Sequence, residues 1–422
     1  MNITEKKQTL EKETMVESEV SGKKSEKLLE IKNIRTYFYT EEGVVKAVDE
    51  VSFDIYKNEV LGLVGETGCG KSVTALSILR LVREPGKIID GTIKYKGENL
   101  LDLTEADMRS FRGKNITMIF QDPLNSLNPV ISVGDQISEV FVLHQQDILK
   151  KDLDERLLER KNKRSRIKEL KTQIGQGELT AAELNKAQKE IKKLKEETNH
   201  IPVMKDVLLD YAEQIVKEVG IADAKEILKR YPHELSGGMR QRVMIAMALS
   251  CNPDLLIADE PTTALDVTIQ AQILDLMKKL KDRFDTSILM ITHDLGIIAE
   301  MCDRVAVMYS GSIVEYATAK DLFSNPRHPY TIGLISAIPS IEKRDQKLHV
   351  IRGMVPNLIF PPSGCRFHAR CDERLEICDK VKTRLNEIGD KYYVACHLFD
   401  DRYKDSPKYV WTEKEDDASY KV

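Results

Sequence analysis

The stretch GETGCGKS, from Gly65 to Ser72, decides the fold class of this chain. It fits the pattern G-x-x-x-x-G-K-[ST] and follows an apolar run, Glu59 to Val64, that has the composition of a buried strand. Glycines at this spacing let backbone N–H groups face phosphate oxygens, while Lys71 adds a positive charge and Ser72 can hold Mg²⁺. The next residues, Val73 to Val82, are predicted to form a helix whose N-terminal dipole also favours an anion. Taken alone, the octet could also be a glycine-rich turn that binds no nucleotide.

Composition and charge limit the classes of protein that fit. The chain has 422 residues, enough for about two to three domains, and 41% hydrophobic with 31% charged residues is an ordinary soluble balance. Lys plus Arg number 64 against 68 Asp plus Glu, so the formal net charge of -4 provides no global field for nucleic acid. No apolar run approaches the ~20 residues that span a bilayer, and residues 1–27 lack the apolar centre of a secretory signal. We expect a cytosolic protein, or one docked on the cytosolic side of a membrane.

The residues before the octet predict a tail and then strands. Residues 1–27 are rich in Lys, Glu, Ser and Thr and are expected to be disordered. Leu29–Ile31 and Val51–Ile55 alternate as strands do. Between them lies the aromatic triplet Tyr37–Phe38–Tyr39, in which a ring could stack on a nucleotide base or simply fill a sheet face.

Three further apolar runs are predicted strands that end in polar residues. They are Thr117–Phe120 before Gln121, Leu255–Ala258 before Asp259 and Glu260, and Ser287–Thr292 before His293. Open α/β sheets bind ligands at the carboxyl ends of their strands. Asp259 can orient Mg²⁺ through water, and Glu260 can polarise a water for attack on a γ-phosphate. Gln121 can reach Mg²⁺ or that water, and His293 can donate to the γ-phosphate, although each residue taken alone is more often a structural polar residue.

A second anion site is predicted where the sequence HELSGGMRQR leads into a helix. Ser236 is a suitable N-cap for a helix that runs through Leu249. The backbone N–H groups of Gly237 and Gly238 would open toward an anion, although no lysine belongs to this site.

A charged segment from about Gln146 to Asn199 predicts a helical hairpin. Its apolar residues recur at steps of three and four, at Ile167, Leu170, Ile174, Leu184, Ala187, Ile191 and Leu194. Two amphipathic helices would flank the turn Gly175–Gly177, with Thr180 and Glu183 forming a capping box for the second. The hairpin could bind a partner, or it could be a solvated insertion without a binding role.

Four of the seven cysteines lie close together near the C-terminus. Cys365, Cys371, Cys378 and Cys396 are spaced C-x5-C-x6-C-x17-C, which is neither a zinc ribbon nor a ferredoxin run. A disulfide scaffold is not expected in a reducing compartment. The four thiols could bind a [4Fe–4S] cluster or Zn²⁺, or they could be buried free cysteines.

Taken together, these motifs resemble the ATP-binding subunit of an ABC transporter over residues 28 to about 400. Gly65–Ser72 resembles the Walker A loop, Gln121 the Q-loop, Leu235–Met239 the signature, Leu255–Asp259 the Walker B strand and Ala264–Asp266 the D-loop. The resemblance implies an α/β P-loop domain, with a core sheet and a helical subdomain, that hydrolyses MgATP between head-to-tail pairs. The implied catalytic residues are Glu260, His293, Gln121 and Lys71, and the implied Mg²⁺ ligands are Ser72, Gln121 and Asp259. The implied nucleotide-binding residues are Phe38, Gly65, Glu66, Thr67, Gly68, Cys69, Gly70, Lys71, Ser72, Val73, Gln121, Asp259, Ser236, Gly237, Gly238 and Asp266.

The resemblance can be narrowed to peptide importers. Asn325–Thr331, Ile351–Leu358 and Gly364–Cys371 resemble the C-terminal extension of oligopeptide, dipeptide and nickel importer ATPases. Gln121–Pro129 and Met239–Ala248 look most like the D-type subunit of the oligopeptide system. This implies a second, different ATPase subunit, two integral membrane subunits and an extracellular or periplasmic binding protein as partners, and it favours a [4Fe–4S] cluster over Zn²⁺ at the cysteines.

The implied organisation is a tail (1–27), a nucleotide-binding domain (28–325) interrupted by the hairpin (147–200), a C-terminal extension (326–400) and a charged tail (401–422). A dipeptide or nickel importer ATPase is one alternative. The other is a soluble ABC ATPase that acts on nucleic acid or ribosomes, which can also carry helices between the Walker A loop and the signature.

Overall fold

The computed structural model describes residues 26–121, 126–177, 179–263, 265–338 and 351–410. The chain divides into two compact units, one made of residues 1–104 and 281–422 and the other of residues 105–280. The expected disordered tail lies outside the described residues as far as residue 25. In the described part of the chain, every helix is too short or too polar to cross a membrane.

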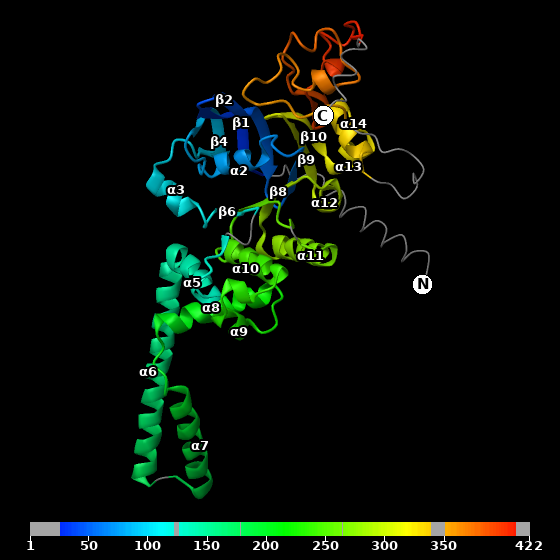
Figure 1. Ribbon diagram of the computed structural model, residues 1–422. Helices are drawn as coiled ribbons and strands as arrows, with labels where there is room; N and C mark the ends of the chain where they lie inside the picture. Colours follow the sequence, from blue (N-terminus) through cyan, green and yellow to red (C-terminus); the bar gives the residue numbers. More distant parts are fainter. Residues whose placement is uncertain (1–25, 122–125, 178, 264, 339–350, 411–422) are drawn as a thin grey trace, which may run out of the picture. The chain divides into compact units, whose positions relative to one another are not determined.

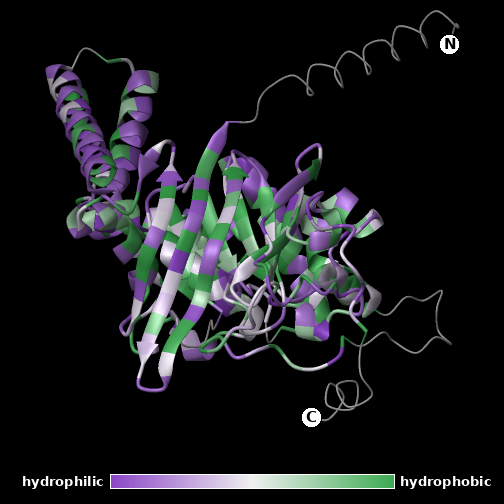
Figure 2. Cartoon of the chain, turned by 90° about the horizontal axis from the view of Figure 1, so that it is seen from above, coloured by the Kyte–Doolittle hydropathy of each residue, from purple (hydrophilic) through white to green (hydrophobic). Residues whose placement is uncertain are grey.

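The first unit contains an antiparallel sheet with the strand order β2-β1-β4-β5 (Figure 1). Its strands are β1 (Lys27–Thr40), β2 (Gly43–Tyr56), β4 (Gly86–Tyr95) and β5 (Glu98–Asn99). The predicted strands Leu29–Ile31 and Val51–Ile55 are confirmed as parts of β1 and β2. Hydrophobic and hydrophilic residues alternate along these strands (Figure 2), as expected when one face of a sheet is buried.

The same unit contains a mixed set of strands around β3, which is Val60–Val64. Strand β3 pairs in parallel with β8 and β9, and β10, β12 and β11 continue antiparallel from β9. These strands are β8 (Ser287–Thr292), β9 (Arg304–Tyr309), β10 (Ser312–Thr318), β11 (Asn386–Gly389) and β12 (Tyr392–Val394). All five residues of β3 are buried, as in a parallel sheet covered on both faces. The helices of this unit are α2 (Lys71–Ile78), α12 (Leu295–Met301), α13 (Ala319–Ser324) and α14 (Pro329–Ser336).

Helix α2 ends earlier than predicted. The sequence predicts a helix through Val82, but Arg80 has a φ of 52°, in the left-handed region. The N–H of Leu81 donates to the carbonyl oxygen of Leu76 at 2.8 Å, a bond that closes the helix end. Arg80 is held there because its guanidinium donates to the carbonyl oxygens of Leu100 and Leu103.

The second unit contains the parallel strands β6 (Ile116–Ile119) and β7 (Leu255–Asp259). Its helices are α3 (Glu105–Phe111), α5 (Val133–His144), α6 (Gln146–Gln176), α7 (Ala181–Glu197), α8 (Met204–Glu218), α9 (Ala224–Lys229), α10 (Gly237–Leu249) and the beginning of α11 (Val267–Phe284). Helix α10 ends at Leu249, as predicted, and each predicted strand is within one residue of its observed end.

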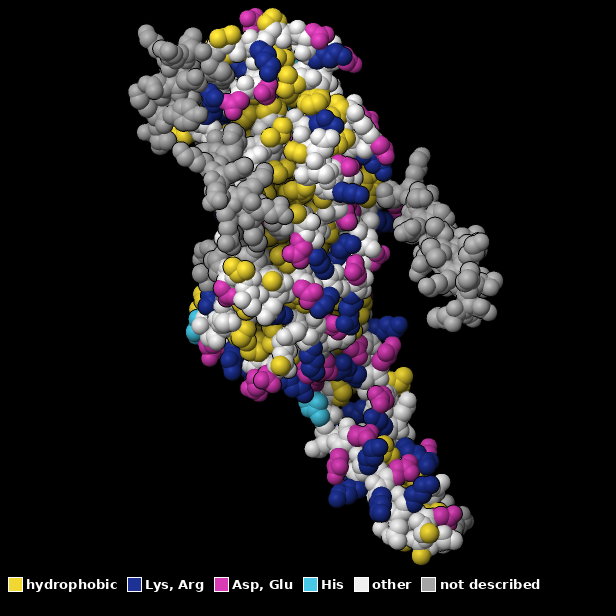
Figure 3. Space-filling view, turned by 90° about the vertical axis from the view of Figure 1, so that its right-hand side faces the viewer, with side chains coloured by type: hydrophobic (Ala, Val, Ile, Leu, Met, Phe, Trp, Pro, Cys, Tyr) yellow, Lys and Arg dark blue, Asp and Glu magenta, His cyan; other side chains and the backbone are white. Residues whose placement is uncertain are grey.

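Helices α6 and α7 form the predicted hairpin and lie side by side in Figures 1 and 2. A small buried cluster joins them, made of Ile167, Leu170, Ala187 and Ile191. Thr180 and Glu183 form the predicted capping box at the start of α7. Side chains of both charges crowd the hairpin surface (Figure 3), so its few buried apolar residues carry most of the contact between the helices.

Candidate functional site

The octet Gly65–Ser72 connects β3 to α2 and packs closely against two other strands. A Cβ atom on Gly65 would lie 2.1 Å from the carbonyl oxygen of Met308 in β9. A Cβ atom on Gly70 would lie 2.2 Å from the carbonyl oxygen of Ala47 in β2, and Gly70 has a φ of 103°. Glycine is therefore required at both positions by space, and at Gly70 also by backbone conformation.

Lys71, the first residue of α2, is held over the loop by carbonyl oxygens. Its Nζ donates to Gly65 O at 2.7 Å and to Glu66 O at 3.1 Å, and the residue is 6% exposed. An ammonium beside the N-terminus of a helix is suited to a phosphate anion. Burial raises the pKa of the neighbouring Cys69 thiol, so this thiol stays neutral and does not compete with phosphate for the lysine.

Glu66 is the one acidic residue of the octet, and it is tied to the C-terminal part of the chain. The two terminal nitrogens of Arg370 donate to its carboxylate oxygens at 2.7 and 3.0 Å. The N–H of Glu66 donates to the hydroxyl of Tyr330 at 2.9 Å. Neither partner was identified from the sequence. Arg370 lies beside a cysteine that had been singled out, but no sequence pattern connects it to a residue 304 positions away.

In the second unit, Glu260 and Gln121 are in direct contact. The Nε2 of Gln121 donates to Glu260 Oε2 at 3.1 Å, and the hydroxyl of Thr263 donates to the same oxygen at 3.0 Å. Glu260 has a φ of 48°, so the chain turns sharply where β7 ends. Asp259, the last residue of β7, is 3% exposed. A conformation that non-glycine residues rarely adopt is often found where a site orients a reactive group. Thr263 was not singled out from the sequence, although it follows Glu260 by three residues.

The signature glycines also have a structural reason. Ser236 caps α10 by accepting a bond from the N–H of Met239 at 3.3 Å. A Cβ atom on Gly238 would lie 2.8 Å from Ile269 in α11, so the helix start packs against that helix. Asp266 accepts a bond from the N–H of Ile269 at 3.0 Å, while Ala264 of the expected D-loop lies outside the described residues.

The remaining predicted residues lie in the first unit. His293 directly follows β8 and is exposed, and Asp294 caps α12. In the aromatic triplet, the hydroxyl of Tyr37 donates to Asp49 at 2.9 Å, while the ring of Phe38 packs over Gly86 and Tyr39 is 47% exposed. Tyr37 is thus committed to a structural contact, and Phe38 and Tyr39 are left as candidates for a base.

The four clustered cysteines are buried together. Each is 7 to 9% exposed. The backbone N–H of Leu375 donates to the sulfur of Cys378 at 3.4 Å. Burial raises the pKa of the Cys371 thiol. Among the residues that the structure describes, no three His, Cys, Asp or Glu side chains form a group that could hold a metal ion. The structure therefore does not support the expected metal site at these cysteines.

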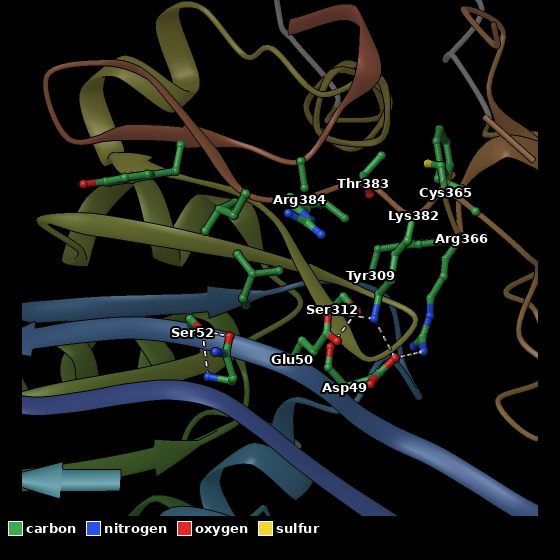
Figure 4. A pocket seen from close by; sticks show the side chains of 18 of the residues that line it. Asp49, Glu50, Ser52, Tyr309, Ser312, Cys365, Arg366, Lys382, Thr383 and Arg384 are labelled. Carbon is green, nitrogen blue, oxygen red and sulfur yellow. Dashed lines mark hydrogen bonds and ion pairs between the residues drawn. The ribbon is translucent and has the colours of Figure 1, made fainter. Parts of the chain in front are cut away.

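A cavity of about 590 Å³ next to Cys365 is lined by charged side chains, several of which form ion pairs with one another (Figure 4). Arg366 and Lys382 both bind the carboxylate of Asp49, and Lys382 also reaches Glu50 at 2.8 Å. Burial alone would raise the pKa of Asp49, but Arg366 and Lys382 hold it below its usual value. The cavity wall thus attaches the C-terminal part of the chain to β2.

Comparisons with known families and proteins agree with these motifs. The family described as ABC transporter matches residues 48–263, and the one described as oligopeptide/dipeptide transporter, C-terminal region, matches residues 314–378. The oligopeptide transport ATP-binding protein AppD of Bacillus subtilis is 44% identical over 375 residues, covering 89% of this chain and 97% of AppD. The dipeptide transport ATP-binding protein DppD of Bacillus subtilis is 43% identical, covering 89% of this chain and 96% of DppD. The oligopeptide transport ATP-binding protein OppD of Escherichia coli is 40% identical, covering 89% of this chain and 95% of OppD.

Solved structures show the same fold. The ATP-binding cassette MJ0796, solved as a dimer bound to ADP and Pi, aligns with a TM-score of 0.50 at 20% identity, covering 69% of this chain and 99% of MJ0796. At this identity the likeness concerns the P-loop nucleotide-binding fold alone. The family matches, together with relatives that share sequence over most of the chain, identify the family. The chain belongs to the ABC transporter family as an ATP-binding, ATP-hydrolysing subunit, and it carries the C-terminal region of oligopeptide/dipeptide transporters.

Proposed function

We propose that this chain couples ATP hydrolysis to the uptake of oligopeptides through membrane subunits, from the cytoplasmic side of the membrane. The proposal rests on the contacts that connect Lys71, through Glu66, to the C-terminal part of the chain. Lys71 is anchored on the carbonyl of Glu66, and Glu66 is in turn bound by Arg370 within the region typical of oligopeptide/dipeptide transporters. Nucleotide binding and the peptide-transporter region are thus joined in one structural unit.

Hydrolysis would proceed at the interface of a head-to-tail pair of nucleotide domains, the second most simply a different ATPase subunit. The ammonium of Lys71 and the imidazole of His293 would stabilise charge on the γ-phosphate, while Ser236, Gly237 and Gly238 of the partner would complete the phosphate site. Glu260 would accept a proton from the attacking water. Mg²⁺, which neutralises phosphate charge, would be held by Ser72, Gln121 and Asp259, whose oxygen donors suit it.

The remaining predicted residues would fix the nucleotide and transmit its state. Phe38 would stack on the adenine, and backbone groups from Gly65 to Val73 would surround the phosphates. Gln121 bonds to Glu260, so movement of the loop at Gln121 is linked to the catalytic carboxylate. That loop would carry closure to two integral membrane subunits, which would receive peptides from an extracellular or periplasmic binding protein.

The hydrolytic role is tested in the transporter purified from membranes. Glu260→Gln should lower the turnover by about 10²-fold or more while nucleotide stays bound in a closed pair. Lys71→Ala should abolish ATP binding. A turnover near that of the parent in either variant would contradict these roles.

The substrate class is tested by uptake into vesicles that hold the purified transporter. ATP-dependent uptake of peptides longer than two residues is the expected result. Uptake confined to dipeptides or Ni²⁺ would reassign the substrate, and purification with nucleic acid or ribosomes instead of integral subunits would overturn the transport role.

We also propose that Cys365, Cys371, Cys378 and Cys396 bind a [4Fe–4S] cluster. Supporting this, the four cysteines are all buried, and the sulfur of Cys378 accepts a hydrogen bond from the N–H of Leu375 at 3.4 Å, a contact that stabilises a thiolate ligand.

The cluster is tested by measuring iron, sulfide and visible absorption of the purified complex. Cys371→Ser should remove the signal, while Cys251→Ser, which changes a cysteine of the other unit, should preserve it. Zinc in place of iron, or no metal at all, would reject the proposal.

A further inference from the structure

Glu66 creates an electrostatic problem inside the phosphate-binding loop. Its carboxylate carries the same sign of charge as the phosphates that the loop is suited to bind, and its side chain is 28% exposed. A negative charge at this position would lower the affinity for ATP unless it were neutralised or turned away.

Arg370 neutralises the Glu66 carboxylate through a bidentate ion pair. Both terminal nitrogens bind the Glu66 carboxylate, at 2.7 and 3.0 Å, and the arginine side chain is 6% exposed. This fork geometry fixes direction as well as charge, which a lysine could not do.

Arg370 is itself held in place from several sides. Its Nε donates to the carbonyl oxygen of Arg352 at 2.8 Å, and its guanidinium lies 5.7 Å from the ring of Tyr309 and 5.9 Å from that of Phe367. The rings of Tyr309 and Phe367 are in edge contact, with centroids 5.1 Å apart. The guanidinium therefore has a fixed position before it meets Glu66.

The backbone of Glu66 is held from the same side. Its N–H donates to Tyr330, which is fully buried, and its carbonyl oxygen accepts from Nζ of Lys71 at 3.1 Å. A shift of Glu66 would therefore move one of the anchors of the phosphate-binding lysine.

We propose that Arg370 is a positioning residue for ATP binding: it holds the Glu66 carboxylate away from the phosphates and, through Glu66, fixes the anchor of Lys71. Arg370 lies between Cys365 and Cys371, so the fold of this cysteine segment, residues 364–378, sets the affinity for nucleotide. The inference rests on the proposed ATPase function and adds a residue to it that belongs to none of the shared nucleotide motifs.

The test is ATP hydrolysis by the purified transporter with Arg370→Gln, Glu66→Gln and both together. Arg370→Gln should raise the KM for ATP by about tenfold, the effect of losing one charge-assisted contact, with kcat changed much less. The double variant should bind ATP better than Arg370→Gln, because it also removes the uncompensated carboxylate. A purely structural role predicts the opposite, a double variant as poor as the single one or worse.

Controls separate this inference from the proposed function. Lys408→Gln breaks an exposed ion pair with Glu373 in the same part of the chain and should leave KM and kcat unchanged. If Arg370→Gln does not assemble, Arg370→Lys should still show a raised KM and faster amide exchange in residues 65–72. A parental KM in the Arg370 variants, or a double variant without improvement, would overturn the inference. Absence of ATP hydrolysis in the parent would instead reject the proposed function.

Discussion

The cysteine segment is stabilised by contacts between residues far apart in the sequence, whereas the helical hairpin is stabilised by contacts between its own two helices. The hairpin is stabilised by residues near one another in sequence: a small apolar cluster, a capping box and the ion pair Arg166–Glu190. The cysteine segment and the residues that follow it depend on contacts with the other end of the chain, Arg370 with Glu66 and both Arg366 and Lys382 with Asp49. We therefore expect changes in the hairpin to leave the phosphate site unaltered and changes in the cysteine segment to affect it.

The strongest contrast is expected between ion pairs of the two regions. Asp49→Ala removes the carboxylate from Arg366, whose side chain is 10% exposed, and should lower the free energy of unfolding by ~3–5 kcal/mol. Glu190→Ala removes one of the two acidic partners of Arg166, which is 46% exposed, and should change the free energy of unfolding much less because solvent screens this pair. Urea unfolding of the full chain measures both. Equal losses in the free energy of unfolding would show that the two ion pairs contribute equally to stability and would contradict this contrast.

Acidification should also separate the regions. His328 caps α14 by accepting from the N–H of Tyr330 at 3.1 Å, and burial lowers its pKa from 6.5 to about 3. The unfolded chain takes up this proton below about pH 6.5 and the folded chain does not, so stability should fall from there toward pH 3 by ~1.4 kcal/mol per unit. His328→Asn, which keeps an acceptor, should flatten this dependence.

The hairpin should not respond in that pH window. Its Glu183 has a lowered pKa, caused by hydrogen bonds from Thr180, so its contribution is complete above the ordinary glutamate pKa and is lost only as the pH falls from there toward the folded-state value, below the window of His328. Amide protection, corrected for the intrinsic exchange rate at each pH, should thus fall around α14 between pH 7 and pH 5 and stay constant in α7. The reverse order would refute the role given to His328.

A smaller effect is expected for the cap of α7. Thr180→Ala removes the capping box and should destabilise the hairpin by ~1 kcal/mol, seen as faster amide exchange in residues 181–197. Thr172→Ala is the matched control, since that hydroxyl bonds a carbonyl of its own helix at 3.0 Å and is not a cap. A change in the KM for ATP in either variant would mean that the hairpin is coupled to the phosphate site.

The smallest effect on activity is expected from shortening the hairpin. Replacing residues 164–194 by a short Gly-rich turn removes its apolar cluster and keeps the Lys163–Glu197 pair at the new end. ATP hydrolysis should stay within about twofold of the parent, because the predicted catalytic and binding residues lie elsewhere. Loss of integral subunits from the purified complex would instead assign the hairpin a partner.

Local patterns predicted much of the fold. Helix α10 from its Ser236 cap to Leu249, the capping box of Thr180 and the strand that ends at Asp259 all follow from residues within a few positions of one another. Helix α2 was predicted less well, because its end depends on Arg80 and two distant carbonyl groups. The resemblance to transporter ATPases was confirmed, since it too rests on short motifs in a fixed order.

The sequence by itself determined that a P-loop motif and a peptide-transporter region exist in this chain and predicted Glu260 as the catalytic carboxylate, because each of these is encoded in contiguous residues. Tertiary structure alone decided that Arg370 neutralises Glu66 and that Asp49 anchors Arg366 and Lys382. The reason is physical: a strand, cap or loop depends on neighbours in sequence, whereas an ion pair across 304 residues exists only after folding has brought both charges out of water and into contact.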